Sequence, residues 1–215
     1  MPQTSTGRVL PFPHKPPAAL SGGHGHEPPP PASSSVQAIQ LGVLLFIGSE
    51  VMLFAGLLAV YTALRFGHVT WPSAQLYLPV KVTWVNTFFL LASCYTMWQA
   101  VAAGRKDQHQ RLIRLLTVTA ALGTLFLCIQ GYEWVQLIRD GLTIRAGVYG
   151  ATFYLLIGCH ALHVLGAVVW LLVVVQLARQ GRFPSSRFVG VEVCAWYWYF
   201  VGGLWVLLFA LVYLN

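Results

Sequence analysis

The chain has 215 residues, of which 57% are hydrophobic and only 9% are charged, and its formal net charge is +7. So few charged residues cannot cover the surface of a soluble protein, whereas a mostly apolar surface is suited to lipid. The composition therefore excludes an ordinary soluble domain and predicts an integral membrane protein.

The first region, residues 1–35, is rich in Pro, Gly, Ser and His. It has too little apolar surface to offset the entropy lost on ordering, so we expect a disordered tail. No apolar core follows its basic residues, so the tail is not expected to be a cleaved signal peptide.

Five apolar segments follow, each close to or above the roughly 20 residues that cross about 30 Å of hydrocarbon. They are residues 36–66, 80–103, 112–138, 148–178 and 188–214. Backbone N–H groups in lipid must be satisfied within the segment, and these segments lack the alternation of barrel strands. We therefore predict an all-α fold, in which residues 36–214 form one bundle of five transmembrane helices.

The first span contains a carboxylate, Glu50, near its middle, and no other ionisable group lies close to it in the sequence. Placing a charge at mid-bilayer costs at least ~2.5–3.5 kcal/mol, so such residues usually face protein or water and mark function. Two more acidic residues, Glu133 and Glu192, fall in the third and fifth spans. Glu192 lies only about one turn inside the membrane, where its charge costs less.

The fourth span contains two histidines, His160 and His163, three residues apart and therefore neighbours on a helical face. Counted along their spans, both histidines and Glu50 reach a similar depth near the midplane. A pairing of Glu50 with His160 or His163 would lower the cost of burying the carboxylate, and a neutral Glu50 bonded to a backbone carbonyl is the alternative. Metal binding by the two histidines is disfavoured, because no third or fourth ligand is evident.

Four cysteines, Cys94, Cys128, Cys159 and Cys194, fall in four different spans without C-x-x-C spacing. We expect them to act as small apolar packing residues, in neither disulfides nor a metal site.

The Lys and Arg residues flank the spans, with nine of the 13 on one side and four on the other. By the positive-inside rule this places the N-terminus in the cytoplasm and the C-terminus on the outer, periplasmic side. Because the charges form no single patch, a nucleic-acid partner is not expected.

Each predicted span also carries one short motif. In chain order these are FIGSEVMLF, WVNTFFLLAS, CIQGYEW, GVYGATFYLLIGCHALHVLG and VEVCAWYWYFVGGLW. Five motifs in this order resemble subunit III of the haem-copper oxidases, in its short bacterial form with five helices. The resemblance covers residues 36–214.

This resemblance implies a non-redox accessory subunit of a cytochrome c oxidase in aerobic respiration. In that family, subunit I carries the haems and copper and reduces O2. Subunit III packs beside it, binds phospholipid, supports proton uptake and protects the oxidase during turnover. We therefore expect no cofactor in this chain, oxidase subunit I and other oxidase subunits as partners, bound phospholipid, and location in the bacterial plasma membrane.

The resemblance also carries over individual residues. Glu50 matches the family's membrane-buried carboxylate known for carbodiimide reactivity, and His160 and His163 match its paired histidines. The other matched positions are expected to contact lipid or a neighbouring subunit, and they are Asn86, Gln130, Glu133, Glu192 and Trp196. No catalytic or metal-binding residue is expected.

The last motif departs from the family, which commonly has WYWHFVD there, because Tyr199 and Gly202 replace the histidine and the aspartate. Roles of those two residues are therefore not carried over. Relatives of subunit III also accompany nitric oxide reductases and quinol oxidases, and nothing in the chain identifies the electron donor.

Two other classes of protein remain open. Intramembrane Glu and His residues are also typical of proton or small-solute transporters, although we find no inverted repeat of the kind that such transporters show. An assembly factor that contacts an oxidase transiently is the other alternative.

Overall fold

The structure is a computed structural model, and it describes residues 32–67, 80–141, 143, 147–181 and 188–214. Five long helices account for nearly all of these residues: α1 (Ala32–Gly67), α2 (Val80–Arg105), α3 (His109–Arg139), α4 (Val148–Arg179) and α5 (Val189–Leu208). A five-residue π-helix, Phe209–Tyr213, continues α5. The all-α prediction is confirmed.

The ends of the helices lie within four residues of the predicted spans, when the π-helix is counted with α5. The largest difference is at the start of α1, which begins at Ala32 instead of residue 36. Of the predicted disordered tail, residues 1–31 lie outside the described residues.

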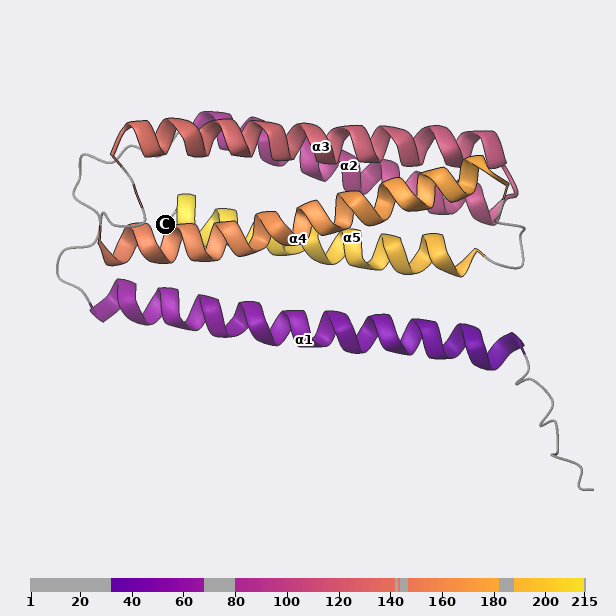
Figure 1. Ribbon diagram of the computed structural model, residues 1–215, viewed down its shortest axis with the longest axis horizontal. Helices are drawn as coiled ribbons and strands as arrows, with labels where there is room; N and C mark the ends of the chain where they lie inside the picture. The colour runs from indigo at the N-terminus through magenta and orange to yellow at the C-terminus, as the bar shows by residue number, and fades with distance from the viewer. Residues whose placement is uncertain (1–31, 68–79, 142, 144–146, 182–187, 215) are drawn as a thin grey trace, which may run out of the picture.

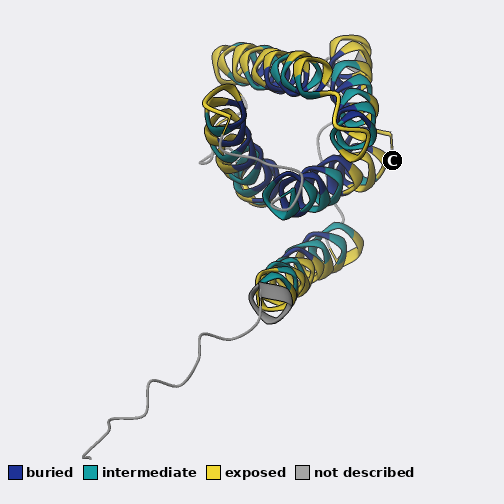
Figure 2. Ribbon diagram, turned by 90° about the vertical axis from the view of Figure 1, so that its right-hand side faces the viewer, coloured by how far each residue is buried: buried dark blue, intermediate teal, exposed yellow. Residues whose placement is uncertain are grey.

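The helices run alternately up and down (Figure 1). Seen end-on, α2, α3, α4 and α5 surround a common centre and turn their buried faces inward (Figure 2). The remaining helix, α1, lies outside this group and packs on α4 and α5. As a result, only 6% of the residues in the most apolar 18-residue stretch of α1 are buried.

Four helices, α1, α3, α4 and α5, are long and apolar enough to cross a membrane. Helix α2 has 26 residues, which is about 39 Å of helix, and it runs alongside the others. Its lower hydropathy comes from polar side chains turned into the bundle: Thr83, Asn86, Thr87 and Ser93 are all at most 4% exposed. The polarity of α2 therefore serves helix packing within a five-helix membrane bundle.

The first four helices each carry an arginine in their last turn, namely Arg65, Arg105, Arg139 and Arg179. A cation at this end complements the negative end of the helix dipole and the free carbonyl groups. After α4, Gly181 takes a positive φ of 67° and donates its N–H to the carbonyl oxygen of Ala178, which terminates the helix.

Two glycines permit close approach between helices. A Cβ atom at Gly123 of α3 would lie 2.4 Å from the ring of Trp198, and one at Gly202 of α5 would lie 2.6 Å from Sγ of Cys94. Because hydrophobic burial does not drive helix association in lipid, such contacts between backbone and side chain are a main source of packing energy.

Candidate functional site

Glu50 of α1 and His163 of α4 meet near the middle of their helices. Oε2 of Glu50 lies 2.7 Å from Nε2 of His163, and their side chains are 12% and 18% exposed. Each residue lies at least about 14 residues from the nearer end of its membrane span, which is roughly 21 Å of helix. The carboxylate expected to need a partner therefore has one, deep in the predicted hydrocarbon layer.

The other ring nitrogen of His163 determines where hydrogen atoms can sit in this pair. Nδ1 lies 2.7 Å from the carbonyl oxygen of Cys159, one helical turn earlier. A carbonyl oxygen only accepts hydrogen bonds, so Nδ1 carries the hydrogen. One further proton is then shared between Nε2 of His163 and Oε2 of Glu50, as a neutral acid with a neutral ring or as an ion pair.

The second histidine, His160, does not pair with Glu50. It is 1% exposed, and its ring stacks on the indole of Trp205 with centroids 5.2 Å apart. Phe54 of α1 contacts both histidine rings edge-on, at 6.4 Å from His160 and 5.1 Å from His163. Of the two pairings left open by the sequence, the structure selects His163.

A second polar cluster lies between α2 and α3. Thr83 Oγ1 donates to Oε1 of Glu133 at 3.1 Å, and Gln130 Nε2 donates to Oε2 of the same carboxyl group at 3.2 Å. Asn86 Nδ2 donates to the carbonyl oxygen of Phe126 at 3.3 Å and lies 3.5 Å from Oε1 of Gln130.

The position of this cluster corrects an expectation from the sequence. Asn86, Gln130 and Glu133 were expected to contact lipid or another subunit, but they are at most 2% exposed. Most of their polar groups bond to one another or to Thr83 and the Phe126 carbonyl inside the bundle, where an unpaired polar group is costly, and Oδ1 of Asn86 is the exception among them. They act as a contact between two helices of the same chain.

Two buried tryptophans of α5 donate hydrogen bonds to α2, and neither is among the site residues expected from the sequence. Trp198 Nε1 donates to Oγ of Ser93 at 3.1 Å, and Trp205 Nε1 donates to Oγ1 of Thr87 at 3.0 Å. The sequence signal is the seven-residue spacing of the tryptophans, which repeats on one face of a helix.

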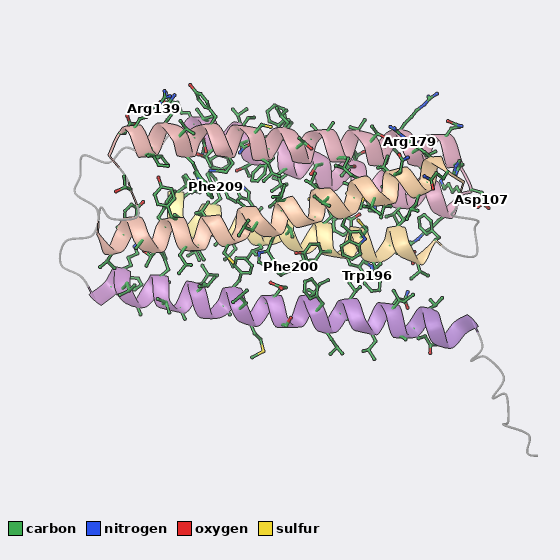
Figure 3. The ribbon with its side chains drawn as sticks, in the orientation of Figure 1. Asp107, Arg139, Arg179, Trp196, Phe200 and Phe209 are labelled. Atoms are coloured by element: carbon green, nitrogen blue, oxygen red, sulfur yellow. The ribbon has the colours of Figure 1, made fainter. Side chains whose placement is uncertain are left out.

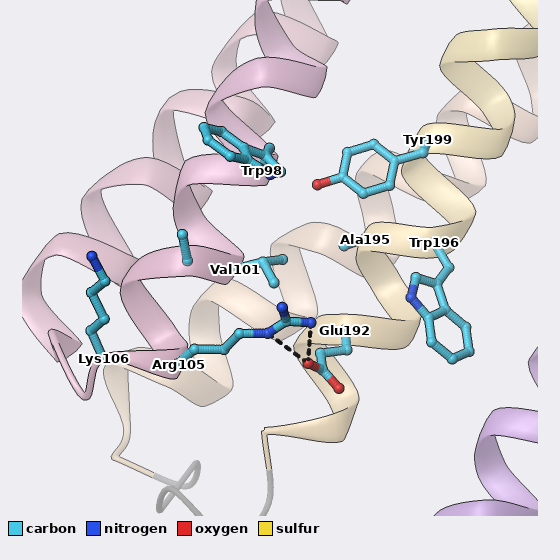
Figure 4. Close-up of a pocket in the computed structure, with 9 residues that line it drawn as sticks. Trp98, Val101, Arg105, Lys106, Glu192, Ala195, Trp196 and Tyr199 are labelled. Carbon is cyan, nitrogen blue, oxygen red and sulfur yellow. Dashed lines mark hydrogen bonds and ion pairs between the residues drawn. The ribbon is translucent and has the colours of Figure 1, made fainter.

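Glu192 and Trp196, in contrast, line an open pocket between α2 and α5. Arg105 donates from Nε and Nη2 to Oε1 of Glu192, at 3.1 and 2.9 Å (Figure 4). The pocket has a volume of about 370 Å³, and its other walls include Trp98 and Tyr199. Figure 4 shows Trp98 on α2 and Tyr199 on α5 facing each other across it.

A second, apolar groove runs between α1 and α5, with a volume of about 270 Å³. It is lined by Val51, Phe54, Ala55, Leu58, Phe200, Gly203, Leu204 and Leu207. It lies near the Glu50 and His163 pair, since Val51 is the next residue after Glu50 and the ring of Phe54 contacts that of His163. Its apolar lining suits a hydrocarbon chain.

The four cysteines are free thiols. Within the described ranges, no group of three His, Cys, Asp or Glu side chains lies close enough to hold a metal ion.

Comparison with known proteins identifies the family. The family model described as cytochrome c oxidase subunit III matches residues 30–215. A probable cytochrome c oxidase subunit 3 of Nocardia farcinica is 32% identical over 176 residues, which cover 81% of this chain and 87% of that protein. Cytochrome c oxidase subunit 3 of Thermostichus vulcanus is 34% identical over 175 residues, covering 81% and 86%, and that of Synechocystis sp. is 34% identical over 200 residues, covering 92% and 81%. The matched region includes all five helices and both polar clusters, and the chain belongs to the cytochrome c oxidase subunit III family.

Proposed function

We propose that this chain is the non-redox accessory subunit of a haem-copper terminal oxidase of the cytochrome c oxidase type. It packs beside subunit I, and subunit I carries the haem and copper. The chain itself binds phospholipid and supports proton uptake and stability during turnover. Membership of the subunit III family implies a heteromeric complex. Our proposal adds subunit I as the neighbour and the roles in phospholipid binding, proton uptake and turnover stability.

The observation that carries this proposal is the Glu50 and His163 pair. It joins α1, the least buried helix, to α4 by a contact of 2.7 Å near the membrane midplane. Because Nδ1 is held by the Cys159 carbonyl, the pair can exchange one proton between Oε2 and Nε2 without losing its hydrogen bond. Such a pair holds α1 against α4 through one hydrogen bond, whichever of the two atoms carries the shared proton.

Phospholipid binding is supported by the two surface pockets. The pocket between α2 and α5 has Arg105 and Lys106 at its mouth and Trp98 and Trp196 in its wall. Cations and Trp side chains at the end of a membrane helix are suited to an anionic headgroup and the interface around it. The groove between α1 and α5 lies farther along α5, toward its C-terminal end, and is suited to an acyl chain.

We place the chain in the bacterial plasma membrane with its N-terminus in the cytoplasm. Arg105, Lys106, Arg111, Arg114 and Arg179 belong to the helix ends on one side of the bundle. Figure 3 shows Arg179 and Asp107 at that end and Arg139 at the other. The positive-inside rule assigns the more basic end to the cytoplasm, and five passes place the two termini on opposite sides.

Purification of the intact complex in a mild detergent tests the proposal. The expected result is stoichiometric recovery of this chain with a haem-containing polypeptide. An isolated chain with transport activity, or recovery far below stoichiometry, would refute the subunit assignment in favour of a transporter or an assembly factor.

A variant comparison tests the role of the pair within that complex. Glu50→Gln is expected to assemble normally, because an amide still donates to Nε2, but to shorten the turnover lifetime or lower the retained phospholipid. Met52→Leu is the matched control, since Met52 lies two residues away on the same helix and is 77% exposed. Identical lifetime and lipid content in both variants would exclude this role.

A further inference from the structure

The outward face of α2 is narrow and aromatic. Between Thr87 and Gly104 its exposed residues are Phe88, Leu91, Tyr95 and Trp98, and Trp84 and Arg105 extend the same row in both directions. The five apolar or aromatic members are between 47% and 68% exposed. We call the row Trp84, Phe88, Leu91, Tyr95, Trp98 and Arg105 the aromatic seam.

The spacing of this seam is that of a helix–helix contact. Its members follow one another at four and three residues, and Ala102 fills the position between Trp98 and Arg105. A 4-3 repeat keeps one row of side chains facing a partner helix that crosses at about 20°. The seam extends from residue 84 to residue 105 on a helix of 26 residues, so it occupies most of the membrane thickness.

Its composition differs from that of the exposed face of α4. The exposed large side chains of α4 are Val148, Leu155, Leu162, Leu165, Val169, Leu172 and Val173, which are all aliphatic. Aliphatic residues suit lipid tails, whereas Trp, Tyr, Phe and Arg are enriched where proteins contact one another. Trp84 and Trp98, near the two ends of α2, also suit the membrane interface. Only the residues between them can therefore distinguish a protein partner from lipid.

Tyr95 gives the strongest indication that the seam contacts protein. It is 58% exposed, and it lies about 15 Å along the helix from Arg105, inside the hydrocarbon layer. Helical side chains lean toward the N-terminus of their helix, which for Tyr95 is away from the nearer membrane surface. Its ring stacks on Trp98 with centroids 5.9 Å apart, and no hydrogen bond to its hydroxyl group occurs among the described residues. A hydroxyl group facing lipid tails is unfavourable, so this position requires a polar partner.

A partner from a different polypeptide is favoured over a second copy of this chain, because membership of the subunit III family implies a heteromeric complex.

We propose that the aromatic seam of α2 is the docking surface for a transmembrane helix of a different polypeptide in the oxidase complex. That helix presents small side chains opposite the large aromatic ones and an acceptor opposite the hydroxyl group of Tyr95. At its charged end the seam leads directly into the pocket between α2 and α5, because Trp98 and Arg105 belong to both. This inference rests on the proposed function, since it names the surface by which the subunit packs.

Photo-crosslinking in the intact complex tests the seam. A benzophenone amino acid replaces Phe88 or Tyr95, and the control replaces Leu162 of α4, which is 69% exposed at a comparable depth. Both seam positions are expected to crosslink to one and the same polypeptide, which is not this chain. The control at Leu162 is not expected to crosslink to that polypeptide. Crosslinks from the seam only to lipid, or to a second copy of this chain, would overturn the inference.

Tyr95→Phe provides a second readout, because it keeps the ring and removes only the hydroxyl group. We expect this chain to dissociate from the detergent-solubilised complex roughly threefold faster or more, the effect of one hydrogen bond between membrane helices. Phe89→Leu on the same helix is the control. An unchanged dissociation rate in Tyr95→Phe would contradict the hydrogen bond.

These tests also separate the two proposals. If the unmodified chain recovers with no haem protein, the proposed function fails. If it recovers with a haem protein, but crosslinks to it arise from α4 and not from α2, the seam is wrong and the proposed function stands.

Discussion

Nε2 of His163 lies 2.7 Å from Oε2 of Glu50, and the opposite nitrogen of the same ring lies 2.7 Å from the carbonyl oxygen of Cys159. The imidazole therefore bridges the backbone of α4 and the carboxyl group of α1. In a membrane, where helices gain little from burying apolar surface against each other, one such bridge contributes substantially to the placement of a loosely packed helix.

A double-mutant cycle measures this contact. Glu50→Leu leaves Nε2 without a partner and is expected to lower the free energy of unfolding by about 1–3 kcal/mol. His163→Leu is expected to cost a similar amount, and the double variant less than the sum, with a coupling energy of about 1 kcal/mol. Unfolding in mixed micelles provides the measurement, and strictly additive effects would contradict the pairing.

The buried carboxyl group of Glu133 gives a second prediction. Thr83 and Gln130 donate to its two oxygens, so Glu133→Leu leaves the Gln130 amide without an acceptor in the bundle. We expect a loss of about 1–3 kcal/mol in the free energy of unfolding. Glu133→Gln keeps one carbonyl oxygen as an acceptor and is expected to cost less. The same loss for both variants would indicate that side-chain volume, and not hydrogen bonding, is responsible.

The ion pair of Arg105 and Glu192 is expected to behave differently. The two side chains are 67% and 21% exposed, so solvent and salt screen their attraction. Glu192→Gln should therefore change the free energy of unfolding by less than about 1 kcal/mol, with a smaller effect at high salt. A loss above about 2 kcal/mol, independent of salt, would mean that the pair is buried in the assembled protein.

The helices could be predicted from the sequence because spanning length and apolarity are local properties. The depth of Glu50 and the two histidines followed from counting residues along the spans. Which histidine meets Glu50 could not be predicted, because that depends on how α4 is rotated against α1 and α5. In the structure Trp205 occupies the face of His160.

The expectation for Asn86, Gln130 and Glu133 came from the resemblance, which does not give the direction in which a side chain faces. In a soluble helix, the polar face marks the surface, but in lipid both faces are apolar and the polar face marks the interior. The same reversal explains why α2 is less apolar than the helices around it, with Thr83, Asn86 and Ser93 fully buried. Arg105 and Glu192, which are 87 residues apart in sequence, could be paired only once α2 and α5 were seen side by side.

The departure of the last motif at Gly202 leads to a final prediction. A Cβ atom at this position would lie 2.6 Å from Sγ of Cys94, so α2 and α5 approach each other only because residue 202 has no side chain. Gly202→Ala is expected to destabilise the chain by about 1–3 kcal/mol through overpacking. Cys94→Ala, which removes the sulfur atom, should restore most of that loss in the double variant. Gly203→Ala is the matched control, since no atom lies within 4 Å of a Cβ atom there. Equal effects of the two glycine substitutions on the free energy of unfolding would show that helix propensity, and not the contact with Cys94, governs this position.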